Sequence, residues 1–185
     1  MHATARFLDR LSFGIDRLLR AIALVGLVLM VAFISLQVVA RYGFSAPPAW
    51  TEEAARYAMV WVGLLGAAIS YRAGFDPKLV KLPATLPRPL LALAALLRGA
   101  AVVIFLGPIL FFCFFGPGLN PERSFLARNL YTTAESFDMP TIFVAVTVPI
   151  FIIAIFLHGL AHCARGLATL RTPRPERDFN ALDHA

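Results

Sequence analysis

A run of twenty residues without a charge, Ala21–Ala40, restricts what this chain can fold into more than any other feature. An α-helix rises about 1.5 Å per residue, so the run would form about 30 Å of helix, the hydrocarbon thickness of a bilayer. Its apolar core is longer than the roughly 7–15 residues of a cleavable signal peptide, and no clear A-x-A cleavage site follows it. The run therefore predicts a retained membrane-spanning helix.

The composition leads to the same class of protein. Of the 185 residues 59% are hydrophobic, and the mean hydropathy is +0.73. Soluble domains are only about 45–50% apolar, so this composition indicates an integral membrane protein. Residues 50–71, 90–115 and 141–161 are the other predicted spans. The expected fold class is an all-α membrane protein, a single membrane domain with four transmembrane helices.

The segment before the first span, residues 4–20, alternates charged and apolar residues. Apolar side chains recur at helical spacing on one side, and arginines lie on the other. This pattern is typical of an amphipathic helix on a membrane surface, so we expect an interfacial helix that leads into span one, residues 21–40. The apolar positions are Phe7, Leu8, Leu11, Ile15, Leu18 and Leu19, and the arginines are Arg6, Arg10 and Arg17.

Lys and Arg are divided unequally between the two sides of the predicted membrane. The N-terminal segment, the loop after span two and the tail after span four hold four each, twelve of the 17 in the chain. Cytoplasmic loops collect these residues, so both termini are predicted to be cytoplasmic, with a basic tail at 166–185 that could hold anionic membrane lipids. This placement accounts for the net charge of +6, and no nucleic-acid partner is expected. The opposite side receives Arg41, Arg56, Arg123 and Arg128.

Span two opens with the charged sequence WTEEAAR, Trp50–Arg56. Only residues 57–71 are uncharged, and they would form about 22 Å of helix, which is too short for the bilayer. The span must therefore bring Glu52, Glu53 and Arg56 to the edge of the hydrocarbon or slightly within it. Helical spacing pairs Glu52 with Arg56 (i,i+4) and Glu53 with Arg56 (i,i+3).

Three interpretations of this charge cluster stay open. It could be an ordinary helix start among the headgroups, which contributes a few tenths of a kcal/mol. It could be buried against a second protein, because a charge within the bilayer costs roughly 2.5–3.5 kcal/mol and a polar partner would offset that cost. It could also be a proton or ion site, although the arginine already neutralises much of the acidic charge. Further along the span, the pairs Gly63–Ala67 and Gly66–Ser70 allow close helix contact, within the bundle or with a partner.

Prolines predict local features of the remaining spans. Gly107-Pro108 should bend span three, and Pro149 should kink span four. Pro140 suits the first position of span four, with Asp138 close to the positive end of that helix. Between these spans, Asn120-Pro121 could start a short helix. Its apolar side would be Leu126, Leu130 and Phe137.

No motif for catalysis can be assembled from this chain. It lacks a Ser-His-Asp set, a Walker loop and an H-E-x-x-H sequence, so we expect neither an enzyme nor a bound cofactor. His158 and His162 have a spacing that can hold a metal, but third and fourth ligands are missing, and no metal is expected. Their role stays open. Cys113 and Cys163 lie in different apolar runs, outside any CxxC motif, and are interpreted as free thiols.

The opening of span two reads W-x-E-E-x-x-R-Y-x-x-x-W-x-x-x-x-G-A, and with four spans it resembles the small, Q-type membrane subunit of tripartite ATP-independent periplasmic (TRAP) transporters. The segments ARYGF (40–44) and AESFDMP (134–140) fit as well, and the resemblance covers roughly residues 10–165. Many relatives have a histidine shortly after the arginine that matches Arg72, where this chain has Phe75-Asp76-Pro77. The matching residues, candidate partner-binding or structural positions, are Trp50, Glu52, Glu53, Arg56, Tyr57, Trp61, Gly66, Ala67 and Arg72.

The resemblance implies a function without chemistry in this chain. In that family a large multi-span subunit moves the substrate, usually with sodium, and a periplasmic binding protein delivers an organic anion. The small subunit is a scaffold beside the large one in the bacterial inner membrane. Two alternatives stay open: the membrane anchor of a redox complex, which a haem absorption band would support, and a stand-alone four-span protein, which would need no partner.

Overall fold

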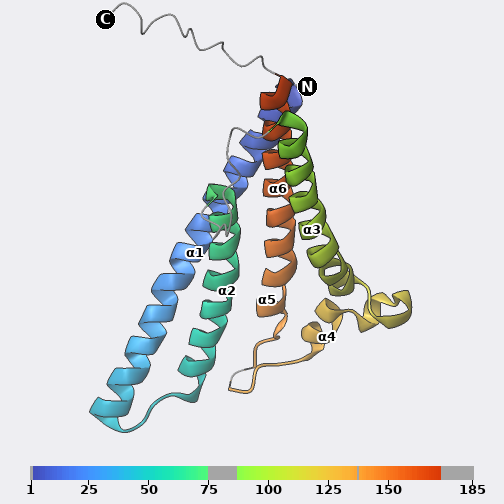
Figure 1. Cartoon of the computed structure of the whole chain (residues 1–185). Helices are drawn as coiled ribbons and strands as arrows, with labels where there is room; N and C mark the ends of the chain where they lie inside the picture. Colours follow the sequence, from blue (N-terminus) through green and yellow to red (C-terminus); the bar gives the residue numbers. More distant parts are fainter. Residues whose placement is uncertain (1, 75–86, 137, 172–185) are drawn as a thin grey trace, which may run out of the picture.

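The computed structural model describes residues 2–74, 87–136 and 138–171, and in these residues the chain is almost entirely helical (Figure 1). The predictions for the loop after span two and for the end of the basic tail lie outside the described residues. The elements are α1 (His2–Phe44), α2 (Ala49–Ala73), α3 (Arg88–Phe114), the 3-10 turns η1 (Pro117–Leu119) and η2 (Pro121–Arg123), α4 (Phe125–Tyr131), α5 (Ile142–Ala145) and α6 (Thr147–Arg171).

Among the residues described, four helices are long and apolar enough to cross a membrane, as many as the sequence predicts. The predicted spans 50–71 and 90–115 coincide with α2 and α3 to within two residues at each end. The fourth helix extends further than expected, because α6 continues to Arg171 and includes the first residues of the predicted tail. The protein is therefore a multi-pass membrane protein.

The first helix is longer than the predicted span. α1 is continuous from His2 to Phe44, about 64 Å, with no break at residue 20 where the interfacial helix was expected to end. Its inward side matches the predicted apolar side only in part: Leu19 and Ile15 pack into the core and Leu11 and Leu18 are exposed. The polar residues Ser12 and Asp16 are buried on the inward side as well. The location of this segment on a membrane surface stays a prediction.

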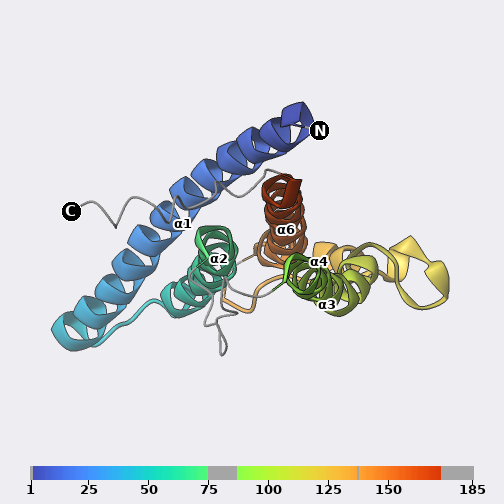
Figure 2. The same cartoon turned by 45° about the horizontal axis from the view of Figure 1, so that its top comes forward.

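The helices are arranged around α6, which contacts α1, α2 and α3. Figure 2 shows α1 and α3 on opposite sides, with α2 and α6 between them. In the most apolar part of the fourth span, Ile142–Cys163, 39% of the residues are buried within this chain, whereas none of those in the most apolar part of α1 is fully buried. A small core of Leu19, Leu65, Ala68, Ala154 and Ile155 joins α1, α2 and α6. Most apolar side chains therefore face outward, toward lipid or another protein.

Both ends of α2 have clear local causes. Pro48 precedes the helix in an extended conformation, and the hydroxyl of Thr51 donates a hydrogen bond to its carbonyl oxygen at 2.7 Å. At the other end, Gly74 has φ +73°, and its N–H bonds to the carbonyl oxygens of Ser70 and Tyr71. A left-handed glycine of this kind terminates helices because it lacks the Cβ that would clash.

The prolines of the fourth span act as predicted at Pro149 and differently at Pro140, and the bend expected at Pro108 stays a prediction. The fourth span is interrupted at Val146, between α5 and α6, where the ring of Pro149 prevents a regular helical turn. Pro140 is not a first helical residue: it forms an isolated β-bridge with Thr133, and α5 begins only at Ile142. Pro108 lies inside α3, which continues through it to Phe114.

The segment between α3 and α5 contains a short helix, as predicted, but divided in two. The side chain of Asn120 accepts a hydrogen bond from the N–H of Glu122 and starts η2. Ser124 then caps α4 by accepting from the N–H of Ala127 at 3.1 Å, which separates α4 from η2. Phe137, expected on the apolar side, lies outside the described residues.

Candidate functional site

The first candidate site is a loop cluster formed by Glu53, Tyr57 and the backbone of Glu135 and Ser136. The carboxylate of Glu53 accepts hydrogen bonds from the Tyr57 hydroxyl at 2.8 Å, from Glu135 N–H at 3.2 Å and from Ser136 N–H at 2.8 Å. Only 5% of Glu53 is exposed. Hydrogen bonds to an ionised acceptor are stronger than neutral ones, so this carboxylate attaches the segment before α5 to the start of α2.

This geometry corrects the predicted pairing of the two acids. Glu53 turns toward the loop, and the predicted Glu53–Arg56 pair is not formed among the residues described here. Arg56 pairs with Glu52 instead, at 4.0 Å, and both side chains are about 60% exposed. Because an exposed pair at this distance contributes little, the two acids have different roles: Glu53 is a structural residue, and Glu52 is on the surface.

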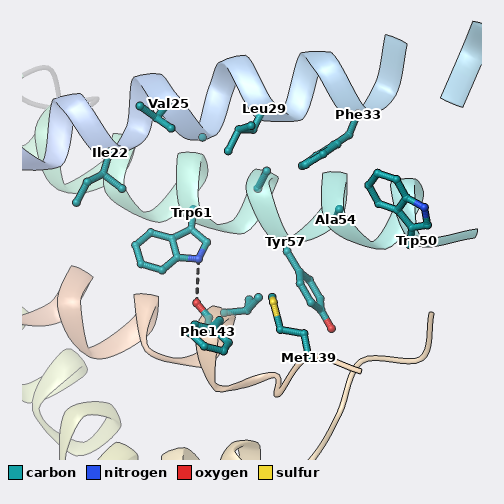
Figure 3. A pocket seen from close by; sticks show the side chains of 13 residues that line it. Ile22, Val25, Leu29, Phe33, Trp50, Ala54, Tyr57, Trp61, Met139 and Phe143 are labelled. Atoms are coloured by element: carbon teal, nitrogen blue, oxygen red, sulfur yellow. Dashed lines mark hydrogen bonds between the residues drawn. The ribbon is translucent and has the colours of Figure 1, made fainter. Parts of the chain in front are cut away.

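The aromatic residues of the motif line one side of the same region. Tyr57 and Trp61 project from α2 toward Met139 and Phe143 (Figure 3), and the indole N–H of Trp61 donates to the carbonyl oxygen of Phe143 at 3.0 Å. Trp50 packs against Phe33 of α1 with ring centroids 5.9 Å apart. Between α1, α2 and α5 these residues border an apolar cavity of about 490 Å³.

A second group, the junction cluster, lies near the other end of α2. It consists of Ser12, Asp16, Arg20, Arg72 and His158, from three helices. Arg72 donates from Nε to the hydroxyl oxygen of Ser12 at 3.0 Å and from Nη1 to the carboxylate of Asp16 at 3.2 Å. Asp16 also accepts from Nε of Arg20 at 2.8 Å. Its carboxylate, 5% exposed, is therefore shared between two guanidinium groups.

His158 completes the junction cluster from α6. Its Nδ1 is 2.8 Å from the Ser12 hydroxyl, and the residue is fully buried. Because that hydroxyl oxygen already accepts from Arg72, its own hydrogen is available to donate to His158. The arrangement binds α1, α2 and α6 together at one end. His162, one turn later, packs edge-on against Tyr71 with ring centroids 5.9 Å apart.

Neither cluster has the geometry of a reaction centre. The Glu53 carboxylate is occupied by three donors, and the Asp16 carboxylate faces two arginines. In the described part of the chain, no group of three or more His, Cys, Asp or Glu side chains could hold a metal ion. What both arrangements can do is fix helices and a loop in place, because each joins segments that are distant in sequence.

One face of α2 remains exposed. Between residues 51 and 72 five residues are exposed, and they recur every three or four positions, so they form one stripe along the helix. Gly63 and Gly66 make no close helix contact within the described chain, since a Cβ at either position would meet nothing within 4 Å. The five residues, which we call the outward stripe, are Glu52, Arg56, Met59, Gly63 and Ala67.

Sequence reasoning missed most of the junction cluster. The family motif includes Arg72, and the histidine spacing drew attention to His158, but no sequence motif includes Ser12 or Asp16. Their i,i+4 spacing, with Leu19 and Ala23 following at i+3 and i+7 from Asp16, was the available signal for a buried side of α1. The backbone donors of the loop cluster had no such signal, because they lie 82 and 83 residues away from Glu53.

Comparison with known proteins identifies a family for most of the chain. The model of the family described as "Tripartite ATP-independent periplasmic transporters, DctQ component" matches residues 30–169. A protein of Haemophilus influenzae (strain ATCC 51907 / DSM 11121 / KW20 / Rd) named "Putative TRAP transporter small permease protein" is 36% identical over 61 residues. That alignment spans 33% of this chain and 38% of the relative.

Proposed function

Because the chain belongs to the family of the DctQ component of tripartite ATP-independent periplasmic transporters, we propose that it is the non-catalytic small membrane subunit of such a transporter. It scaffolds a large multi-span transport subunit in the bacterial inner membrane, with both termini in the cytoplasm. The large subunit takes up an organic anion, a carboxylate or sugar acid, together with sodium. A periplasmic binding protein delivers that anion. Family membership supports the subunit assignment, and the resemblance in the opening of span two supports the further roles.

The observation that carries the scaffold proposal is the outward stripe of α2. It contains a charged pair, Glu52 and Arg56, at one end and the small residues Gly63 and Ala67 further along. Charges at the hydrocarbon edge favour a polar neighbour, and small residues let a second helix approach closely. We therefore assign the stripe to contact with the large subunit. Glu53 contributes indirectly, by holding the segment before α5 against α2.

The stripe can be tested with a matched pair of substitutions. Ala67 and Ala101 are both exposed alanines in predicted spans, but only Ala67 belongs to the stripe. Ala67→Leu should reduce co-purification of the large subunit with a tagged small subunit, and it should reduce uptake of the anion. Ala101→Leu adds the same side chain to α3 and should leave both close to wild type. Equal recovery with the two variants would contradict the assignment.

The two acids provide a second, independent test. Glu52→Ala combined with Arg56→Ala should lower recovery of the large subunit without changing the melting temperature of the small subunit. Glu53→Ala should lower that melting temperature itself, because it removes the carboxylate that accepts hydrogen bonds from Tyr57 and from the two loop N–H groups. Glu122→Ala, an exposed acid outside both regions, is the control. If Glu53→Ala melted like wild type, the structural role of the loop cluster would be refuted.

A further inference from the structure

A second cavity is lined by residues of α3, α4 and α6 and of the turns that follow α3. α4 and these turns lie at the end of the bundle opposite the N terminus (Figure 1). Its volume is about 490 Å³. The floor is apolar and comes from α3 and α6, with Phe112, Cys113 and Val148 among its residues. Two arginines, Arg123 and Arg128, line it as well. The cavity therefore combines an apolar interior with two positive charges.

The positions of the two arginines follow from the turns between α3 and α4. Gly116 lies so close to Arg123 that an added Cβ would overlap the Arg123 carbonyl group and would be 2.7 Å from the Arg123 Cβ. Arg123 is thereby held against the end of α3. Ser124, 3% exposed, caps α4 and accepts the N–H of Arg128 on its carbonyl oxygen at 3.1 Å. Arg128 is consequently placed in the first turn of α4, on the same cavity.

The charge of this cavity is not balanced from within. In the described parts of the chain, no acidic side chain lies within ion-pair distance of either guanidinium. The cavity also borders a predicted membrane span, because the apolar segment Leu96–Leu119 includes the part of α3 that lines it. Exposed phenylalanines continue from the cavity along that helix. They include Phe105, Phe111 and Phe112.

We propose that this cavity binds an anionic phospholipid, with the headgroup phosphate between Arg123 and Arg128 and an acyl chain over the aromatic face of α3. Guanidinium groups recognise phosphate through paired hydrogen bonds. A soluble phosphate ester has no apolar part that could cover the floor of the cavity. A phospholipid satisfies both parts of the site at once. This inference does not depend on the transporter assignment.

The test measures lipid retention on the full-length protein by native mass spectrometry. Phosphatidylglycerol should remain bound after phosphatidylcholine of the same chain length has dissociated. Each of Arg123→Gln and Arg128→Gln should weaken phosphatidylglycerol binding about fivefold, and the double variant should weaken it roughly 25-fold. Arg41→Gln removes one exposed charge outside the cavity and is the matched control. If it weakened binding as much as either cavity variant, the lipid would be held by net charge, and the proposal would be overturned.

A competition experiment separates a lipid from a soluble anion. Millimolar sn-glycerol 3-phosphate or inorganic phosphate should not displace phosphatidylglycerol, because neither can occupy the apolar floor. Displacement by either would identify a site for soluble phosphate compounds and would refute the lipid assignment.

Both arginines are exposed, so the variants should keep the melting temperature of the wild type. Equal retention of phosphatidylcholine and phosphatidylglycerol by the wild-type protein would also refute it.

Discussion

At Gly116 the chain leaves α3, and the missing side chain leaves room for the backbone of Arg123. The φ of Gly116 is −81°, which any residue can adopt, so the requirement for glycine is steric. An added Cβ would overlap the Arg123 carbonyl group. The turn between α3 and α4 therefore requires glycine at position 116 for lack of space, although the backbone conformation there would allow any residue.

We expect Gly116→Ala to destabilise the protein by about 1–3 kcal/mol, because the backbone must move to admit one methyl group. Thermal unfolding of the detergent-purified protein would measure the change. Gly107→Ala is the matched control: it lies inside α3, its added Cβ would meet nothing within 4 Å, and alanine favours helix by up to ~1 kcal/mol. A Gly116→Ala protein as stable as the Gly107→Ala protein would disprove the steric requirement.

The acids of span two show how far single residues could be interpreted without a structure. The short uncharged run correctly drew attention to Glu52 and Glu53, and helical spacing correctly paired Glu52 with Arg56. Spacing along a helix could not distinguish the two acids, because it describes only neighbours on the same helix. The partners of Glu53 are backbone N–H groups in a distant loop, and only the folded chain brings them to α2.

At the scale of elements, the junction cluster ties the first third of α1 to α2 and α6. The ion pair between Asp16 and Arg72 is largely buried, with side chains 5% and 16% exposed. Removing one partner of a buried pair leaves the other charge uncompensated, which is strongly destabilising. Replacing both by apolar residues avoids that penalty. A variant that removes one partner should therefore be less stable than a variant that replaces both.

Asp16→Leu should destabilise the protein by roughly 3–5 kcal/mol, because the Arg72 guanidinium loses its counter-charge. The double variant Asp16→Leu with Arg72→Leu should recover most of this loss. Thermal unfolding would give both values, and trypsin cleavage after Arg10 or Arg17 would report whether this part of α1 has come away from the bundle. If the single and double variants unfolded at the same temperature, the pair would have no coupling, contrary to this account.

The ends of the helices were easier to predict from the sequence than the contacts between them. Prolines and glycines stand at or near the ends of α2 and α3, and both helices have long apolar runs, so the sequence was enough to predict where they begin and end. The predicted boundary at residue 20 was inferred from a change in composition, and no proline or helix-ending glycine stands there. Since a helix continues unless something ends it, α1 runs on through that point.

At the scale of the whole molecule, the N-terminal end of α1 and the C-terminal end of α6 lie at the same end of the bundle (Figure 1). An even number of spans requires this. The predicted topology assigns twelve of the 17 Lys and Arg residues to the side of the membrane that this end faces. The positive-inside tendency therefore predicts a cytoplasmic location for both ends.

Cysteine labelling in intact cells would test this orientation. In a protein with Cys113 and Cys163 replaced by alanine, Tyr131→Cys should react with a membrane-impermeant maleimide, because Tyr131 is exposed at the opposite end of the bundle. Phe7→Cys, exposed near the N terminus, should react only after the membrane has been opened. The reverse pattern would show that the protein is inserted the other way round.

The junction cluster also has a consequence for how the protein is made. Ser12 and Asp16 leave the ribosome long before their partners, since Arg72 follows Asp16 by 56 residues and His158 follows Ser12 by 146. The first helix thus enters the translocon with Asp16 paired only to Arg20 of the same helix, and with Ser12 still without the partners that α2 and α6 supply later. A nascent chain that ends before His158 can already form the contacts of Arg72 with Ser12 and Asp16, and it lacks only the contact from α6 that closes the cluster.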